Sequence, residues 1–476
     1  MRSNLNASLS RYMKLSLSAS MLGATLLIGG CASTYQPPKF ELPSAEVAST
    51  PVEYSEWWQQ LNDSVLTGLI NEALTHNTDV LTAMQSVEQS RSNLRLARIT
   101  MLPDVSLGGS ATRQQASDYT AQPGQSGISN VYNAGFNASY EIDLWGRAWK
   151  ARDAIASQLL ASQYARETTR AAIAAQTAKS YFTLLALDAQ LALLEQTQVT
   201  RNDALNLQQL RFKAGASGDY ELQVSQAELA TIAARLPATR AALEQAEAAL
   251  AVLLGRSPKA IVEDHVTRGS ELQVLANLPE VPAGLPADLL MRRPDVRQAE
   301  ARLAAADANL QETRRRYFPG LSITGFFGAE SLSLSDLFDS AARSWSITGA
   351  ITQPIVGLAK VGAQVDAAKA TREQAELAYA QAARNAYADA RSALAGYRAA
   401  REVLLATQQR ADNQNRVKTI IEQRYKGGAA SYFDLLNAER DRLSAENDRV
   451  SALQNRLDAL VSMYQALGGG WSAAEL

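Results

Sequence analysis

Two long stretches without proline constrain the fold of this chain more than any other feature. One covers residues 146–213 and the other residues 357–426; apart from Gly146 and Gly357, with which they begin, the only glycines in them are Gly362 and Gly396. At 1.5 Å per residue, a helix over either stretch would be roughly 100 Å long. An ordinary globular helix has only about 10–14 residues. The sequence therefore predicts an extended helical scaffold in place of a compact domain.

A heptad pattern marks the segment that follows each long stretch. Residues 219–254 and 432–467 are predicted to form helices that return alongside the long ones. Apolar side chains that recur every seven residues are typical of helices packed as coiled coils. Taken alone, these helices are equally consistent with a plain coiled-coil scaffold. The heptad residues are Leu222, Leu229, Leu236, Leu243 and Leu250 in the first segment, and Val450, Leu457, Tyr464 with Leu453, Leu460, Leu467 in the second.

The chain also contains an internal duplication. The segment from Asp79 to Pro103 matches the segment from Asp295 to Pro319 at an offset of 216 residues, and the turn at 211–216 matches 424–429 at an offset of 213. Each half therefore consists of a helix, two strands, a long helix, a tight turn and a returning helix. We assign the repeats to 61–255 and 293–470. Between them, residues 256–292 hold four of the fourteen prolines and are predicted to be a connector.

Four segments alternate between apolar and polar residues with a period of two, which indicates strands with one apolar and one wet face. Their length of about ten residues suits a tilted membrane crossing. Four strands cannot close a membrane barrel, so we expect several copies to share one pore. A small soluble sheet packed on helices is the alternative. The predicted strands are 104–113, 131–142, 320–329 and 344–353, and the aromatic residues near their ends are Trp145, Trp149, Tyr317, Phe318 and Trp345.

The N-terminus has the pattern of a bacterial lipoprotein signal. Arg2, Arg11 and Lys14 precede an apolar run over residues 21–28, and Gly29-Gly30-Cys31 follows. This order predicts a secretory signal over residues 1–30. Cys31 is the only cysteine, so an intrachain disulfide is excluded and we expect it to carry a covalent lipid at the head of a tether over 31–60. The alternative is a cysteine that happens to end the signal.

The composition argues against several other functions. Basic and acidic residues are nearly balanced, and no basic stripe interleaved with aromatic residues indicates nucleic-acid binding. The two histidines, His76 and His265, do not form a metal-binding pattern, and the sequence has no glycine-rich phosphate loop. We therefore expect no enzymatic activity, no metal and no cofactor other than the lipid on Cys31.

These features together resemble the TolC-like outer-membrane efflux proteins, in their lipoprotein branch. The resemblance covers essentially the whole chain after the signal. It implies an α+β membrane protein: a homotrimer in which four strands per chain build a twelve-stranded β-barrel in the outer membrane, continuous with a long α-helical barrel in the periplasm. The residues that carry it are Cys31, Trp57-Trp58, 291–296 (Met-Arg-Arg-Pro-Asp-Val), the paired turns at 211–216 and 424–429, and 467–471 (Leu-Gly-Gly-Gly-Trp).

The resemblance also implies a function and partners. Proteins of this family act as passive exit ducts that receive drugs or other small molecules from a periplasmic adaptor protein and an inner-membrane pump. Ala32, directly after the cysteine, implies sorting of the lipoprotein to the outer membrane. Two alternatives remain at this point: the exit duct of a type I protein secretion system, and a structural envelope lipoprotein without a channel.

The family places a periplasmic gate just after the two turns. Glu221 and Asp434 match each other across the repeat, so a trimer would bring six carboxylates near one axis. Such a ring attracts cations and raises the pKa of its members by like-charge proximity. The alternative is that both acids simply stabilise the first turn of a helix. We assign Glu221, Asp434, Tyr220, Phe433 and Asn437 to the gate.

The turns themselves are the expected docking tips for the adaptor. Their small residues would let another backbone approach, although glycine there also serves as a helix cap. Ala430 stands where some relatives carry an arginine that bridges to the neighbouring acid, so the lock of this gate is expected to differ. The residues assigned to the tips are Arg211, Lys213, Gly215, Arg424, Lys426 and Gly428.

Overall fold

The structure is a computed structural model that describes residues 56–115, 117, 119, 127–275 and 293–469. All of them belong to one compact unit, Leu42–Leu476. The predicted signal, Cys31, most of the tether, residues 276–292 of the connector and the C-terminal Trp471 lie outside the described residues. The first repeat and the connector contain η1 (Trp57–Leu61), α2 (Ser64–His76), α3 (Thr78–Ile99), β1 (Asp104–Gln115), β2 (Ile128–Ile142), α4 (Arg147–Lys213), α5 (Asp219–Leu253), α6 (Pro258–Glu263) and α7 (Leu272–Leu275).

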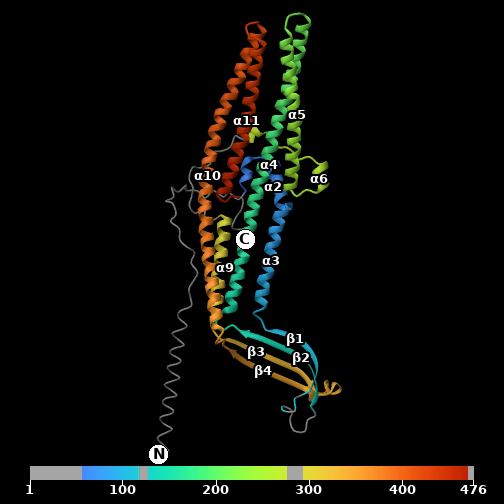
Figure 1. Cartoon of the computed structure of the whole chain (residues 1–476), viewed down its shortest axis with the longest axis vertical. Coiled ribbons are helices and arrows are strands. Elements are labelled where there is room, and N and C mark those ends of the chain that lie inside the picture. The colour runs from blue at the N-terminus through green and yellow to red at the C-terminus, as the bar shows by residue number, and fades with distance from the viewer. Residues whose placement is uncertain (1–55, 116, 118, 120–126, 276–292, 470–476) are drawn as a thin grey trace, which may run out of the picture. The chain divides into compact units, whose positions relative to one another are not determined.

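The second repeat has the same order of elements as the first, and Figure 1 shows the two sets together. Each long helix lacks proline, so its backbone hydrogen bonds continue from the strand end to the turn. The second repeat contains α9 (Pro294–Arg315), β3 (Gly320–Ser331), η2 (Leu334–Asp336), η3 (Ser340–Ala342), β4 (Arg343–Thr352), α10 (Leu358–Lys426) and α11 (Tyr432–Ala466).

The four strands form one antiparallel sheet in the order β1-β2-β3-β4. The sheet has an apolar face on which Leu107, Phe136, Phe327 and Trp345 lie directly opposite one another across the strands. These side chains are 53–74% exposed, so the described part of the chain leaves this face uncovered. The strands β1 and β2 extend beyond the predicted ranges, because polar residues at their far ends continue the pairing up to Gln115 and Ile128.

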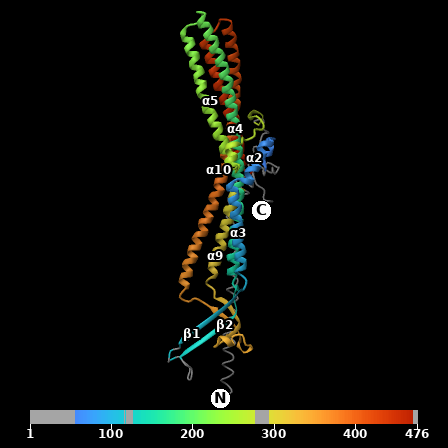
Figure 2. The same cartoon turned by 90° about the vertical axis from the view of Figure 1, so that its right-hand side faces the viewer.

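The helices pack in a fixed order beside the sheet. α3 contacts α4, α4 contacts α9, and α9 contacts α10. Beyond this row, α4 pairs with α5 and α10 pairs with α11, and α11 also packs against α4. Figures 1 and 2 both show the two helical hairpins, α4/α5 and α10/α11, running side by side to their turns. Among the described residues, none of the helices is both long and apolar enough to cross a bilayer.

The main hydrophobic core lies where η1, α2, the connector, α4 and α11 meet. Trp57 stacks on Tyr464 with ring centroids 5.6 Å apart, and Leu457 is fully buried. The predicted seam of α11 is confirmed, since all six of its residues are at most 7% exposed. In α5 the prediction holds only in part, because Leu236 and Leu250 are buried whereas the other three heptad leucines are half-buried.

Two polar contacts hold the segments around this core. Asp63 caps α2, and its other carboxylate oxygen accepts hydrogen bonds from the Tyr181 hydroxyl and the Ser270 N–H, both at 3.1 Å. Gly269 is required beside it, because a Cβ there would lie 2.4 Å from an Asp63 oxygen. At the start of the second repeat, the Arg293 guanidinium donates to Asp389 and to the Ala466 carbonyl, both at 3.1 Å.

Candidate functional site

The turns of the two helical hairpins have the same backbone geometry. Gly215 and Gly428 have φ values of 69° and 74°, a left-handed conformation that glycine adopts without steric cost. The N–H groups of Ala216 and Ala429 then donate, at 2.8 Å, to the carbonyls of Arg211 and Arg424, which closes the end of each long helix. A Cβ on either glycine would meet no atom within 4 Å. The two predicted tips are therefore exposed, small and alike.

The two predicted gate acids occupy equivalent positions, the third residue of α5 and of α11. The Asp434 carboxylate accepts hydrogen bonds from the Ser431 N–H at 2.8 Å and from the Ser431 hydroxyl at 2.7 Å. The Asp434 N–H donates back to the Ser431 hydroxyl, which completes a capping box. The two hydrogen bonds from Ser431 lower the pKa of Asp434. Within one chain, Asp434 thus acts as a helix cap.

The first repeat has no such box, because Gly218 takes the position of Ser431 before Glu221. The other predicted gate residues surround the same two helix starts. Tyr220 is 67% exposed and Phe433 is 50% exposed, whereas Asn437 is half-buried. The structure therefore presents two aromatic rings to solvent beside the acids, at matching places in the two hairpins.

A tyrosine near the end of α10 connects the two hairpins. The Tyr425 hydroxyl accepts hydrogen bonds from the Arg211 guanidinium at 2.6 Å and from the Gln208 amide at 3.1 Å. The Arg211 guanidinium carbon also lies 5.1 Å from the centre of the Tyr425 ring, a cation–π distance. We call Gln208, Arg211 and Tyr425 the tip clasp.

The tip residues predicted as one group thus lie in different surroundings. Arg211 is bound to Tyr425 in the tip clasp, whereas Arg424, the equivalent residue of the second repeat, is exposed. Lys426 pairs with Glu422 of its own helix at 2.9 Å, and Lys213 is exposed. Arg424 and Lys213, together with the two turn glycines, are therefore the predicted docking residues that remain on the surface.

Further along the same hairpins, four charged residues meet between α4, α5 and α11. Arg201 of α4 is only 3% exposed; its guanidinium bonds to Glu439 and lies 3.8 Å from Glu228. Arg440 binds the same Glu228, with its Nε at 3.1 Å. This hydrogen bond raises the pKa of Arg440. We call Arg201, Glu228, Glu439 and Arg440 the buried charge cluster after its buried centre, Arg201; the Arg440 side chain itself is 48% exposed.

Neither the tip clasp nor the buried charge cluster was predicted from the sequence, although a signal exists. Leu194, Arg201 and Gln208 recur every seven residues on α4, and they are 6%, 3% and 1% exposed. Two polar residues thus continue an apolar seam, and a polar residue in such a seam specifies register and partner at a cost in stability. Among the described residues, no group of three or more His, Cys, Asp or Glu is placed to hold a metal ion.

The fold and the paired hairpin tips define a class of protein, an array of long helices joined to a small sheet with one exposed apolar face. Residues 69–256 and 285–469 match the model of the family described as outer membrane efflux protein. This chain belongs to that family. The predicted family and fold class are thereby confirmed, as is the location in the outer membrane.

Individual relatives agree with this assignment. The antibiotic efflux pump outer membrane protein ArpC and the toluene efflux pump outer membrane protein TtgC, both from Pseudomonas putida, are each 30% identical over 470 residues, 95% of either chain. The crystal structure of the CmeC outer membrane channel of Campylobacter jejuni superposes with a TM-score of 0.84 at 25% identity, covering 92% of this chain and 96% of CmeC. The protein is an outer-membrane efflux channel.

The buried charge cluster predicts a large difference between two arginines of the first hairpin. Arg201→Met leaves Glu439 buried without its cation, which costs about 3–5 kcal/mol in local stability. Arg240→Met is the matched control, since the Arg240–Glu195 pair is about half exposed and such pairs contribute about 0–1 kcal/mol. Amide hydrogen exchange over residues 195–245, which include both arginines, measures both. Equal exchange in the two variants would contradict the assigned role of the cluster.

Proposed function

We propose that the protein works as a homotrimeric, passive exit duct of a tripartite efflux pump and catalyses no reaction. The observation that carries this proposal is the four-stranded sheet. Among the described strands, β1 and β4 each have one edge without a partner, and the apolar face is uncovered. An open sheet edge is not tolerated in lipid, so strands of neighbouring copies must pair with these edges. Three copies supply the twelve strands that the family fold requires.

The proposed cargo is small organic molecules, delivered by a periplasmic adaptor and an inner-membrane pump. Support comes from the relatives, whose names refer to antibiotic and toluene efflux. The same names disfavour the protein-secretion alternative, and the uncovered sheet disfavours a structural lipoprotein without a channel. The adaptor would dock on the two hairpin tips, which the chain leaves exposed.

We further propose that the tip clasp holds the periplasmic end of the duct closed by fixing one hairpin to the other. Tyr425→Phe removes the acceptor of both hydrogen bonds and should raise open probability several-fold in planar-bilayer recordings of the purified trimer. Tyr119→Phe is the control, because that tyrosine is fully exposed between β1 and β2, far from the tips, and should leave the recordings unchanged. Identical closed states in wild type and Tyr425→Phe would refute the proposed role.

The acid ring is proposed as the selective element of the gate. Two variants separate a ring from a helix cap. Asp434→Asn keeps an acceptor for the cap but removes the charge, so cation preference in bilayer recordings should fall. Ser431→Ala removes the capping hydroxyl but keeps the charge, so it should cost about 1 kcal/mol of helix stability and leave selectivity intact. The reverse pattern would leave Asp434 with a capping role alone.

Docking of the adaptor at the tips can be tested by crosslinking in cells. Cysteine at Gly215 or Gly428 would strain the positive φ, so the probes are Ala216→Cys and Ala429→Cys, one residue further along. Both should capture a periplasmic protein with a heterobifunctional crosslinker. Gly396→Cys is the control, since its position is also open but lies midway along α10, away from the turn. Equal capture from all three positions would count against tip docking.

Cys31 is proposed to carry a covalent lipid, palmitate among its acyl groups, that anchors the tether to the outer membrane. The support is the signal pattern that ends at this single cysteine. Mass spectrometry of the N-terminal peptide should show the chain beginning at Cys31 with the added mass of the acyl groups. Cys31→Ser should abolish that mass. An unmodified peptide beginning elsewhere would disprove lipidation.

A further inference from the structure

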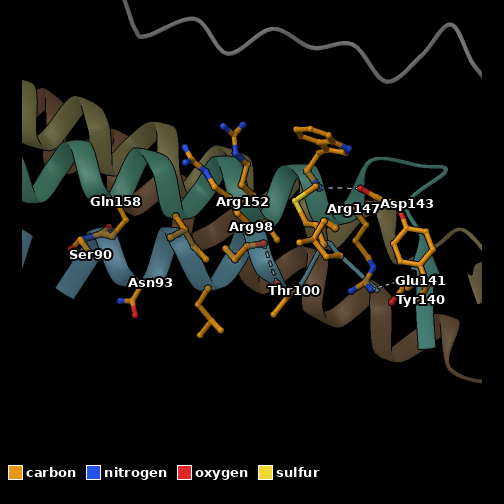
Figure 3. A pocket seen from close by; sticks show the side chains of 18 residues that line it. Ser90, Asn93, Arg98, Thr100, Tyr140, Glu141, Asp143, Arg147, Arg152 and Gln158 are labelled. Carbon is orange, nitrogen blue, oxygen red and sulfur yellow. Dashed lines mark hydrogen bonds and ion pairs between the residues drawn. The ribbon is translucent and has the colours of Figure 1, made fainter. Parts of the chain in front are cut away.

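A groove of about 950 Å³ lies between the C-terminal half of α3 and the start of α4. Figure 3 shows Ser90 and Asn93 of α3 and Gln158 of α4 at one end, and Tyr140 and Glu141 of β2 at the other. Its lining is mainly apolar, and several of the large side chains are exposed although they line a concave surface. The large apolar lining residues are Leu96, Met101, Leu102, Trp149 and Ile155.

The groove is continuous with the apolar face of the sheet. Phe136, Ala138 and Tyr140 occupy alternate positions of β2 and therefore lie on the same, apolar face. Tyr140 also lines the groove. Met101 and Leu102 lie directly before β1. In an outer-membrane channel the apolar face contacts lipid, so the groove lies at the edge of the bilayer on the helical, periplasmic side. Trp149 and the stacked pair Trp145–Phe318 lie close in sequence to the ends of β2 and β3, where interfacial aromatic residues are expected.

Three arginines and two carboxylates line the groove. Glu141 pairs with Arg147 at 2.6 Å, and Asp143 accepts a hydrogen bond at 3.0 Å from the backbone N–H of Trp149 in the first turn of α4. Both carboxylates are therefore engaged.

The other two arginines retain unused hydrogen-bond donors. The Arg152 guanidinium pairs with Asp153 at 3.1 Å and lies 5.8 Å from the centre of the Trp149 ring. Arg98 is exposed, and the part of the chain that the structure describes offers it no carboxylate partner. The groove thus combines an apolar wall with positive charge at the membrane edge.

We propose that this groove binds a phospholipid of the periplasmic leaflet that carries a net negative charge. The acyl chains lie against Leu96, Leu102 and Trp149, and the phosphate receives hydrogen bonds from Arg98 and Arg152. Charge-assisted hydrogen bonds from guanidinium groups to phosphate are the strong ones in proteins, and basic pockets beside spanning segments bind anionic headgroups. The bound lipid seals the gap between α3 and α4 below the sheet.

The first experiment is a lipid titration of the delipidated full-length trimer by native mass spectrometry. Phosphatidylglycerol should bind to wild type and bind about tenfold more weakly to the double variant Arg98→Gln/Arg152→Gln. Arg91→Gln/Arg95→Gln is the matched control, because these two arginines lie on α3, the helix of Arg98, but outside the groove. Phosphatidylcholine and inorganic phosphate should compete poorly, the first for lack of net charge and the second for lack of acyl chains. Equal binding to both double variants overturns the proposal.

A second experiment locates the lipid. Phosphatidylglycerol brominated on its acyl chains should quench the fluorescence of Trp149, so Trp149→Phe should lose a quenched component that wild type shows. A photocrosslinking residue at Gln158 should label lipid. If it labels a second copy of the chain instead, or if Trp149→Phe leaves the quenching unchanged, the groove is a contact between copies and the proposal fails.

Discussion

The unpaired edges of β1 and β4 are the constraint on which the rest of this structure depends. Each edge presents a row of backbone N–H and C=O groups that water cannot satisfy inside a bilayer. The adjoining face, with Leu107, Phe327 and Trp345 largely exposed, cannot be left in water without cost either. Both demands are met only when neighbouring copies pair edge to edge in lipid. The arrangement of the strands also fixes where the long helices start, because α4 and α10 begin within a few residues of the strands that precede them.

The duplication produced two hairpins with the same turns but different attachments. Gly215 and Gly428 close equivalent turns, yet Arg211 reaches across to Tyr425 while Arg424 remains exposed. The start of α11 has a capping box, whereas the start of α5 has a glycine in place of the serine. The two hairpins of one chain therefore have equivalent turns but different polar contacts at their tips.

Much of the single-chain fold could be predicted from local pattern. The positions of the long helices, the four strands and the two turns follow from proline-free runs, period-two alternation and glycine placement. The structure places these elements within a few residues of the predicted ranges. The seam of α11 was predicted correctly because its apolar residues follow a regular heptad spacing, which places them all on the face that packs against the core. In α5 the heptad leucines are less buried, since charged and polar residues such as Glu228 and Ser225 take the contact positions near the tip.

The sequence by itself determined the repeat, the element order, the apolar strand face and the acids at the start of each returning helix. Each of these is encoded within a few residues, and period and spacing are enough to find them. Only the tertiary structure decided that Arg201 is buried against Glu439, that Gln208 and Arg211 meet Tyr425, and that Arg98 and Arg152 share a groove. The members of each pair lie on different helices and are 54 to 238 residues apart in the sequence. The heptad spacing of Arg201 and Gln208 marks them as members of a packed seam, but the partner that each one meets depends on how distant elements pack together, and that is not encoded in local spacing.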